Sequence, residues 1–284
     1  MKNILVTGGA GFIGSNLIKI LLKKGFKITS LDNYSTGRND NEIIGVKYIN
    51  DDIENIVKLD VEFDTCFHLA AQSRVQPSFD DPEECLRVNV TGTLKVMNWA
   101  RDKNVKVIYA GSSSKHHNPS DSPYAMSKFL GEEICRLYKK TFEVNVETSR
   151  FYNVYGPGEN IDEKFGNVIG IWTAQIKKNE PITIVGDGNQ KRDFIHVNDL
   201  VEGLIKIADA KISNNDGWEL GTGINYSINE LYNFFDKKFK IKSINIPDQP
   251  GNYRETLRVN DDALKLLNWR PKDRLKQHIE NLDI

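Results

Sequence analysis

Residues 4–14 of the chain, ILVTGGAGFIG, decide which fold the sequence adopts. The apolar run at 4–6 predicts a buried strand, and the apolar residues between 15 and 24 recur at the spacing of one helix face. Three glycines, each three residues after the one before, separate these two elements. A chain that turns directly from a strand into a helix needs positive φ angles and close backbone approach, which glycine allows. The stretch therefore predicts a strand, a tight turn and a helix in immediate succession.

The spacing of these glycines, Gly8, Gly11 and Gly14, is also typical of a dinucleotide site. Such a turn brings a pyrophosphate close to the backbone at a helix N-terminus, where free N–H groups and the positive end of the helix dipole face it. Asp32 ends the second predicted strand, 18 residues after Gly14. A carboxylate there accepts hydrogen bonds from a ribose 2′-hydroxyl and repels a 2′-phosphate, so it favours NAD as the cofactor. Arg38 lies nearby in the sequence and keeps NADP open as an alternative.

The first half of the chain continues the same alternation of strands and helices. Further apolar runs predict strands at 27–31, 46–49, 65–69 and 105–109. Continuous apolar strands separated by amphipathic stretches indicate βαβ units in a parallel sheet that is covered on both faces. We therefore expect an α/β protein with a Rossmann-type, doubly wound parallel sheet.

Beyond Pro157 the pattern changes to shorter elements between frequent turn signals. This predicts a smaller, mixed C-terminal region that binds substrate. The expected division is a dinucleotide-binding domain over 1–157 and a mainly substrate-binding region over 158–284, with about 192–210 returning to the first domain.

Composition excludes several classes of partner. The 284 residues include 38 Lys and Arg against 39 Asp and Glu, a net charge of −1, which gives no electrostatic case for nucleic acid or a membrane surface. No apolar run approaches membrane-spanning length, and the first residues do not form a secretory signal. Three scattered cysteines, Cys66, Cys85 and Cys135, predict neither a disulfide framework nor a metal site. We expect a cytoplasmic protein without a metal.

Tyr124 and Lys128 lie four residues apart in a predicted helix, so their side chains share one helix face. A phenol is a weak base at its ordinary pKa of about 10, and a neighbouring ammonium favours its ionised form. The serines at 112–114 follow the apolar strand at 105–109, at the edge of the sheet where such folds bind ligands. The combination predicts a tyrosine general base acting on a hydroxyl group beside the dinucleotide.

With these residues in place, the chain resembles the extended short-chain dehydrogenase/reductase family, in its NAD-dependent sugar-nucleotide epimerase/dehydratase branch. The resemblance covers nearly the whole chain and rests on the stretches 7–14, 31–33, 68–72, 89–93, 124–128, 150–157 and 186–197.

The resemblance implies a role for each matching position. It implies an NAD site made of Gly8, Gly11, Phe12, Ile13, Gly14, Asp32, Asn33, Asp52, Ile53, Leu69, Ala70, Ala71, Asn89, Tyr124 and Lys128. It implies a catalytic set of Ser112, Tyr124 and Lys128, in which Tyr124 is the general base and Lys128 orients the nicotinamide ribose and lowers the pKa of the tyrosine. Ser113 remains an alternative to Ser112. It implies nucleotide-sugar contacts from Gln72, Ser113, Asn153, Arg192 and Arg254.

The sequence departs from the family pattern at three places. Ser113 and Ser114 stand where dehydratases carry an Asp-Glu pair and decarboxylases a Glu, so water elimination lacks its acid and base. Tyr124 follows Ser112 by only 12 residues, a shorter loop than is usual, and this loop carries His116 and His117 as either surface residues or substrate contacts. Gln249 replaces a common arginine, which removes one expected diphosphate contact.

These features lead to a functional hypothesis with two alternatives. We expect an NAD-dependent nucleotide-sugar epimerase acting at C4, similar to enzymes for UDP-glucose or UDP-N-acetylglucosamine, through a 4-keto sugar. A dehydrogenase or 4-keto reductase with net turnover of NAD(H) is the first alternative, and a non-catalytic dinucleotide-binding module is the second.

The resemblance also implies a homodimer. The stretches 91–101 and 126–139 are similar to the helices that pair across a two-fold axis in dimers of the family. The apolar residues of these stretches are equally consistent with ordinary core helices; they are Val96, Met97, Phe129, Ile134 and Leu137.

Overall fold

A seven-stranded sheet forms the centre of the computed structural model, which describes residues 1–284. Its strand order is β10-β6-β5-β4-β1-β2-β3, and every neighbouring pair is parallel. The strands are β1 (Asn3–Thr7), β2 (Lys27–Asp32), β3 (Lys47–Asn50), β4 (Thr65–His68), β5 (Lys106–Ser112), β6 (Val146–Phe151) and β10 (Trp218–Leu220). Thr7 at the end of β1 pairs with Leu31 on one side and His68 on the other, so the carboxyl ends of neighbouring strands form one edge.

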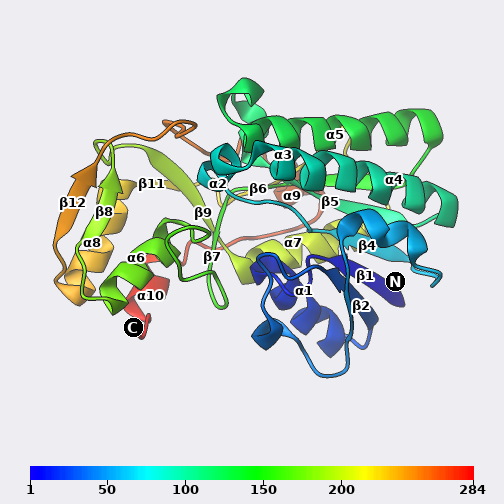
Figure 1. The fold of residues 1–284 in the computed structure, drawn as a ribbon, viewed down its shortest axis with the longest axis horizontal. Coiled ribbons are helices and arrows are strands. Elements are labelled where there is room, and N and C mark those ends of the chain that lie inside the picture. The colour runs from blue at the N-terminus through cyan, green and yellow to red at the C-terminus, as the bar shows by residue number, and fades with distance from the viewer.

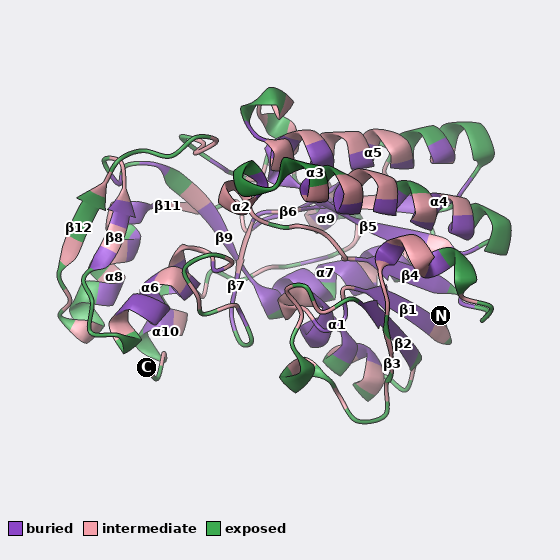
Figure 2. Cartoon of the chain, in the orientation of Figure 1, coloured by how far each residue is buried: buried purple, intermediate pink, exposed green.

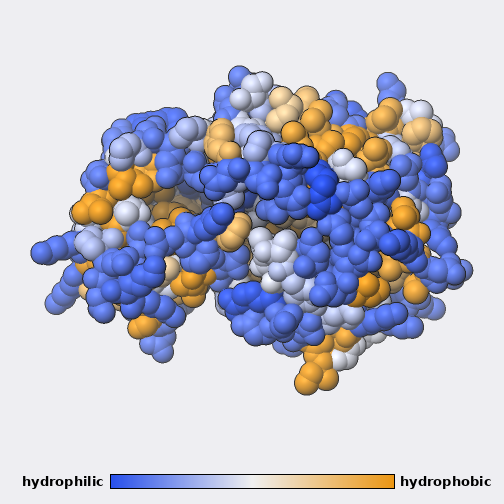
Figure 3. Space-filling model, viewed as in Figure 1, coloured by the Kyte–Doolittle hydropathy of each residue, from blue (hydrophilic) through white to orange (hydrophobic).

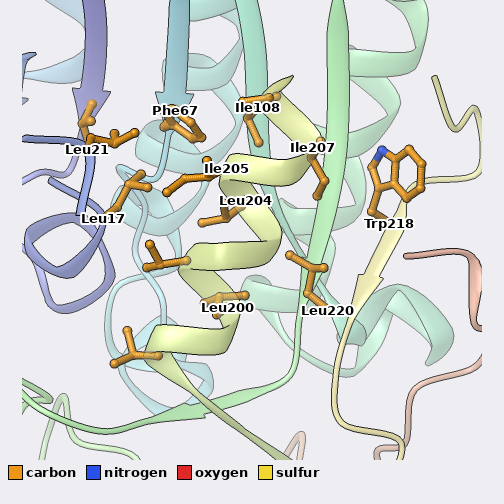
Figure 4. Packing of buried hydrophobic residues seen from close by; sticks show 14 of the residues in the cluster. Leu17, Leu21, Phe67, Ile108, Leu200, Leu204, Ile205, Ile207, Trp218 and Leu220 are labelled. Carbon is orange, nitrogen blue, oxygen red and sulfur yellow. The ribbon is translucent and has the colours of Figure 1, made fainter. Parts of the chain in front are cut away.

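Helices cover both faces of this sheet (Figure 1). One face carries α1 (Phe12–Lys23), α7 (Val197–Asp209) and α9 (Asp262–Leu266), and the other carries α4 (Gly92–Lys103) and α5 (Pro123–Phe142). Side chains alternate along a strand, so Ile4 and Val6 join the core under α1 and α7, while Leu5 joins the core under α4 and α5. Figure 4 shows Leu200 and Leu204 of α7 among the apolar side chains of the first of these cores. The predicted doubly wound α/β fold is confirmed.

A smaller body lies beside the carboxyl edge of the sheet, at the left of Figure 1. Its three-stranded sheet contains β7 (Asn153–Tyr155), β9 (Lys191–His196) and β11 (Asn225–Ser227), with one parallel and one antiparallel pair. A parallel pair, β8 (Ile182–Val185) and β12 (Ser243–Ile246), completes its strands. The helices α6 (Val168–Lys177), α8 (Ile228–Phe239) and α10 (Leu275–Glu280) pack on a separate core that includes Trp172 and Phe235. Figure 2 shows this buried layer apart from that of the large sheet.

The chain crosses between the two bodies more than once. After β9 it re-enters the large body as α7, and β10 then becomes the edge strand beside β6. Trp218 of β10 and Trp269 are fully buried in the same core as α7. The core of the large body therefore includes α7, β10 and Trp269, whereas β9 is a strand of the smaller sheet.

Short helical segments link these elements. They are α2 (Val75–Asp80), α3 (Pro82–Leu86), the 3₁₀ turns η1 (Asn39–Asn41), η2 (Ile53–Lys58), η4 (Ser113–His116) and η5 (Pro119–Asp121), and the π-helical turn η3 (Arg87–Thr91). None of the helices combines the length and the apolar character that crossing a bilayer requires. In the space-filling view the surface is mainly hydrophilic, with scattered hydrophobic side chains (Figure 3).

Candidate active site

A cavity of about 480 Å³ lies between the carboxyl edge of the large sheet and the smaller body. Residues from both bodies line it, from the glycine turn after β1 to Trp172 of α6 and Thr183 of β8. The predicted site residues that line it are Gly8, Gly11, Phe12, Ile13, Gly14, Asp32, Asn33, Ile53, Leu69, Ala70, Ala71, Gln72, Ser112, Ser113, Tyr124, Lys128, Asn153 and Arg192. Three predicted residues do not line it, namely Asp52, Asn89 and Arg254.

The glycine turn has the geometry that a pyrophosphate needs. Gly8 has a φ of +74°, and a Cβ at this position would lie 2.8 Å from the backbone nitrogen of Ala70. A Cβ at Gly14 would lie 2.1 Å from the carbonyl oxygen of Gly8, so neither position accepts a side chain. Helix α1 begins immediately afterwards at Phe12, and its N-cap, Gly11, gives no side-chain hydrogen bond to the first N–H groups. These N–H groups are thus available to an anionic ligand in the cavity.

Asp32 is fixed at the end of β2 by two backbone hydrogen bonds. Its carboxylate accepts from the N–H of Ala10 at 2.9 Å and from the N–H of Tyr34 at 2.8 Å. Burial raises the pKa of Asp32, and these two hydrogen bonds act in the opposite direction. Each carboxylate oxygen retains a second lone pair, so the group can still accept from the hydroxyls of a ribose.

Asp52 is engaged in a different contact from the one expected. Its carboxylate forms an ion pair with Arg87, with distances of 3.1 and 3.0 Å, and accepts from the N–H of Glu54 at the start of η2. The neighbouring Ile53 lines the cavity, as does Asp51. Ile53 thus offers an apolar side chain from this segment, which suits the face of an adenine ring.

Asn89 lies behind the cavity wall and is buried. Its side-chain oxygen accepts from the N–H of Gln72 at 2.8 Å, and its nitrogen donates to the carbonyl of Gln72 at 2.9 Å and to the hydroxyl of Ser127 at 2.8 Å. Asn89 thus joins the loop after β4 to helix α5, and it holds Gln72 at the cavity.

Helix α5 places Tyr124 and Lys128 in its first two turns. Ser122 is the N-cap and accepts from the N–H of Ala125 at 3.0 Å, with Pro123 at the first helical position. The Lys128 ammonium donates to the carbonyl of Ala110 at 2.9 Å. Burial lowers the pKa of Lys128 to about 8.

The phenol of Tyr124 has two neighbours that favour its ionised form. Burial raises the pKa of Tyr124, whereas the Ser112 hydroxyl and the charge of Arg74 both lower it. The Ser112 oxygen also accepts from the N–H and the hydroxyl of Ser114, at 3.2 and 3.0 Å. Of the two serines left open by the sequence, Ser112 is the one beside the phenol.

The two predicted arginines lie in different surroundings. Arg192 lines the cavity, donates to the side-chain oxygen of Asn252 at 2.5 Å and to the carbonyl of Lys191, and has no carboxylate partner. Burial lowers the pKa of Arg192 to about 10. Arg254 is exposed and forms a two-pronged ion pair with Asp187, at 2.9 and 3.0 Å.

Asn153 lines the cavity, and its amide nitrogen donates to the hydroxyl of Thr256 at 3.3 Å. Gln249, which stands in place of the family's arginine, also lines the cavity.

The short loop between Ser112 and Tyr124 is attached to the protein through both of its histidines. His116 contacts the buried carboxylate of Glu219 at 2.9 Å. The His117 ring stacks on Tyr253, with 3.8 Å between ring centroids and 7° between planes. Tyr253 lines the cavity and His117 does not. His117 therefore supports a residue of the cavity wall and does not itself face the cavity.

Sequence reasoning missed Arg74 and Tyr253, which both line the cavity. Arg74 lies two residues after the stretch 68–72, which places it at the same edge of the sheet. No spacing pattern marks Tyr253, because the fold brings it to the cavity from the C-terminal part of the chain. No group of three or more His, Cys, Asp or Glu side chains is arranged to hold a metal ion.

Comparison with known proteins agrees with this geometry. Residues 4–221 match the family model described as "NAD dependent epimerase/dehydratase family". The chain is 33% identical over 301 residues to a putative UDP-glucose 4-epimerase of Methanocaldococcus jannaschii, covering 98% of this chain and 96% of the relative.

Two solved structures share the fold over 98% of this chain. An epimerase of Methanothermobacter thermautotrophicus has a TM-score of 0.92 and 29% identity, with 90% of its own chain covered. A UDP-glucuronic acid 4-epimerase of Bacillus cereus, solved with UDP-glucuronic acid and NAD, has a TM-score of 0.89 and 27% identity, with 96% covered. The glycine turn, the free N–H groups of α1 and the fixed Asp32 carboxylate fit NAD, which is the cofactor of this family. The chain belongs to the NAD-dependent epimerase/dehydratase family of enzymes.

Proposed function

We propose that the protein is a nucleotide-sugar 4-epimerase. The observation that carries this proposal is that one cavity contains the NAD-compatible glycine turn, the Ser112, Tyr124 and Lys128 side chains, and the unpaired cation of Arg192. An enzyme that changes the configuration of a sugar carbon needs a redox cofactor, a proton acceptor and an anchor for the nucleotide diphosphate, and the cavity has residues suited to each of these.

The proposed division of labour follows the two bodies. Residues 1–157 hold NAD, and the smaller body with most of 158–284 holds the nucleotide sugar. Of the later elements, β10 joins the edge of the large sheet and α7 covers one of its faces. Asn153 and Arg192 stand on the cavity side of β7 and β9, and a planar guanidinium suits the oxygens of a diphosphate. Arg254 instead fixes the turn at Asp187 through its ion pair, so we assign it a structural contact rather than a diphosphate contact.

The chemistry we propose begins at the Tyr124 phenolate. NAD, held by the glycine turn and Asp32, would supply the acceptor and the donor of the C4 hydride. Tyr124 takes the proton of the C4 hydroxyl, and Ser112 hydrogen-bonds the same hydroxyl group. Lys128 orients the nicotinamide ribose from the second turn of α5.

Two observations favour epimerisation over related reactions. Ser113 and Ser114, beside the catalytic hydroxyl, offer neither the acid nor the base that water elimination needs. Two relatives that are 33% and 30% identical over 98% and 97% of this chain are described as UDP-glucose 4-epimerases, the first of them as putative, whereas relatives described as UDP-glucuronic acid decarboxylases are 28–30% identical. Net oxidation or reduction of the sugar is the second candidate. Gln249 lines the cavity in place of an arginine, which removes one expected contact to the diphosphate of the substrate.

We also propose that the protein is a homodimer that pairs through α4 and α5. Leu94 and Leu137 are exposed on these helices, and Phe129 and Ile134 are partly exposed. The apolar residues Val96 and Met97 face the core of the subunit instead.

Proton NMR of the purified protein with NAD and separate nucleotide sugars tests the function. The panel contains UDP-glucose, UDP-N-acetylglucosamine, UDP-glucuronic acid, GDP-mannose and dTDP-glucose. We expect a new anomeric signal from one UDP sugar without accumulation of NADH. NADH formed in proportion to an oxidised sugar would make the enzyme a dehydrogenase, and the absence of any product across the panel would contradict the proposal.

A further inference from the structure

Arg74 is a cation in the cavity that no side chain neutralises. It lies at the N-cap position before α2 and lines the cavity. Its Nε donates to the carbonyl of Phe165 at 2.7 Å, and no carboxylate oxygen lies within 4.0 Å of its guanidinium. Of the five N–H groups of the guanidinium, only one is therefore used within the protein.

The guanidinium of Arg74 has no compensating charge beside it in the protein. Burial lowers the pKa of Arg74, and the charges of Tyr124, Glu159 and Asp162 act on it only from longer range. Arg150, by contrast, pairs directly with Glu132 and Glu219. Arg74 is partly buried, and a carboxylate would replace the water around its guanidinium with charge-assisted hydrogen bonds, which are stronger than neutral ones. The open side of Arg74 thus matches an anionic group that arrives with the substrate.

The position of Arg74 identifies the part of the substrate that it faces. Arg74 and Arg192 are the two arginines that line the cavity, and they come from different bodies. Arg192 contacts Asn252 in the smaller body, where we have placed the diphosphate. Helix α2, which begins directly after Arg74, is joined to Tyr124: the Tyr124 N–H donates to the hydroxyl of Ser78 in α2 at 3.1 Å, and the charge of Arg74 lowers the pKa of the phenol. Because Tyr124 contacts the reacting sugar, Arg74 faces the sugar rather than the diphosphate.

We infer that the sugar of the substrate carries a carboxylate and that Arg74 binds it. This inference rests on the proposed function and specifies its substrate class: a nucleotide uronic acid, or a nucleotide sugar with an acidic substituent. A guanidinium can donate two parallel hydrogen bonds to a carboxylate, a geometry that a neutral hydroxymethyl group cannot use. Arg74 is then a specificity-determining residue, since it favours the acidic sugar over its neutral counterpart.

UDP-glucuronic acid and UDP-glucose make a matched pair of probes, because they differ in a carboxylate against a hydroxymethyl group at C6. Isothermal titration of the NAD-saturated protein with each of them, and with UDP alone, separates the contribution of the sugar from that of the nucleotide. We expect UDP-glucuronic acid to bind the wild-type protein about 10-fold more tightly than UDP-glucose, the scale of one charge-assisted hydrogen bond.

Arg74→Gln should abolish this preference and leave the affinity for UDP unchanged. Arg74→Lys retains the charge without the planar fork, so part of the preference should remain. Arg192→Gln is the matched control, because removal of the other cavity arginine should weaken all three ligands by a similar factor. Affinity for NAD and the melting temperature show whether each variant is folded. If Arg74→Gln does not fold, the partial loss of the preference in Arg74→Lys tests the inference.

Three results would overturn the inference. Wild-type protein that binds UDP-glucose at least as tightly as UDP-glucuronic acid contradicts it, and so does a preference that survives in Arg74→Gln. Arg74→Gln could also lower the affinity for both sugar nucleotides by the same factor and raise the pKa of the catalytic base in the pH–rate profile. That result would mean that Arg74 acts through Tyr124 alone. Failure of the proposed function looks different: the Arg74-dependent preference would persist in binding, but no sugar would be epimerised.

Discussion

At the scale of single residues, the reactivity of Tyr124 depends on opposing effects. Burial raises the pKa of the phenol, and Ser112 and Arg74 lower it. Tyr124→Phe removes the proton acceptor without changing the shape of the ring. We expect kcat to fall at least ~10²-fold while the affinity for the nucleotide sugar is largely retained. Rate measurements by NMR, with binding by calorimetry, check this, and a nearly wild-type rate would exclude Tyr124 as the base.

Asp32 should decide between the two dinucleotides by its charge. Ala10 and Tyr34 donate to different oxygens of Asp32, so Asp32→Asn retains only one of these two hydrogen bonds, and it removes the repulsion of a 2′-phosphate. The ratio of the dissociation constants for NADP and NAD should therefore fall by about 10-fold, equivalent to about 1.4 kcal/mol. Calorimetric titration with both dinucleotides measures it. If the ratio of the two dissociation constants is unchanged, residues around the ribose other than Asp32 select NAD over NADP.

Lys128 should make the stability of the NAD-free protein depend on pH. Its pKa is lowered by burial to about 8, from an ordinary value of 10.5. Between these two pH values the unfolded chain binds the Lys128 proton and the folded protein does not, so the free energy of unfolding contributed by this residue rises with pH. Urea denaturation from pH 7.5 to 10 should show wild type gaining stability relative to Lys128→Met. A constant difference over this range would contradict the lowered pKa.

At the scale of elements, a buried charge cluster joins parts of the chain that are distant in sequence. Arg150 of β6 pairs with Glu132 of α5 and with Glu219 of β10, and Glu219 also contacts His116 and the hydroxyl of Tyr152. The cluster thus connects the edge strand, helix α5 and the short loop after Ser112. Through the contact between His116 and Glu219, the cluster attaches this loop to β10 next to the catalytic serines.

Removal of Arg150 should destabilise the protein strongly. Arg150→Met leaves two buried carboxylates without their cation, and breaking such a cluster costs about 3–5 kcal/mol of the free energy of unfolding. The control is Arg101→Met, since Arg101 pairs with Asp102 at the surface, where the loss should stay below about 1 kcal/mol. Urea denaturation of both variants at pH 7 provides the comparison. Equal losses would mean that the buried cluster contributes no more than a surface pair.

At the scale of the whole molecule, the cavity exists because two bodies meet at one edge of the sheet. Strands β7 and β9, which carry Asn153 and Arg192, belong to the smaller body, whereas Ser112 ends β5 of the large sheet. Helix α7 follows β9 directly and packs into the core of the large body. The direct connection from β9 to a buried helix limits how far the two halves of the site can separate.

The exposed apolar residues of α4 and α5 should be covered in solution by a second copy of the chain. Light scattering at micromolar concentration should give about twice the chain mass of 32.3 kDa. Leu137→Glu places a charge on the exposed face, at a residue that is 53% exposed, and should shift the mass towards the monomer without unfolding the subunit. A wild-type mass near 32.3 kDa would contradict the dimer.

The sequence by itself determined the features that depend on local spacing. The strand, glycine turn and helix of 4–14, the carboxylate at Asp32 and the four-residue spacing of Tyr124 and Lys128 follow from backbone geometry over a few residues. These features were sufficient to predict the α/β fold and NAD, because parallel strands bring their carboxyl ends to a common edge.

Only the tertiary structure decided which charged side chains are free for a ligand. Arg254 forms an ion pair with Asp187 and Asp52 forms one with Arg87, and no spacing pattern in the sequence indicates either pair. Arg74, which no spacing pattern distinguishes, lines the cavity without a carboxylate partner. The physical reason is that a charge is neutralised by whatever the fold brings within a few ångströms, and residues 35 or 67 positions apart in the chain meet only after folding.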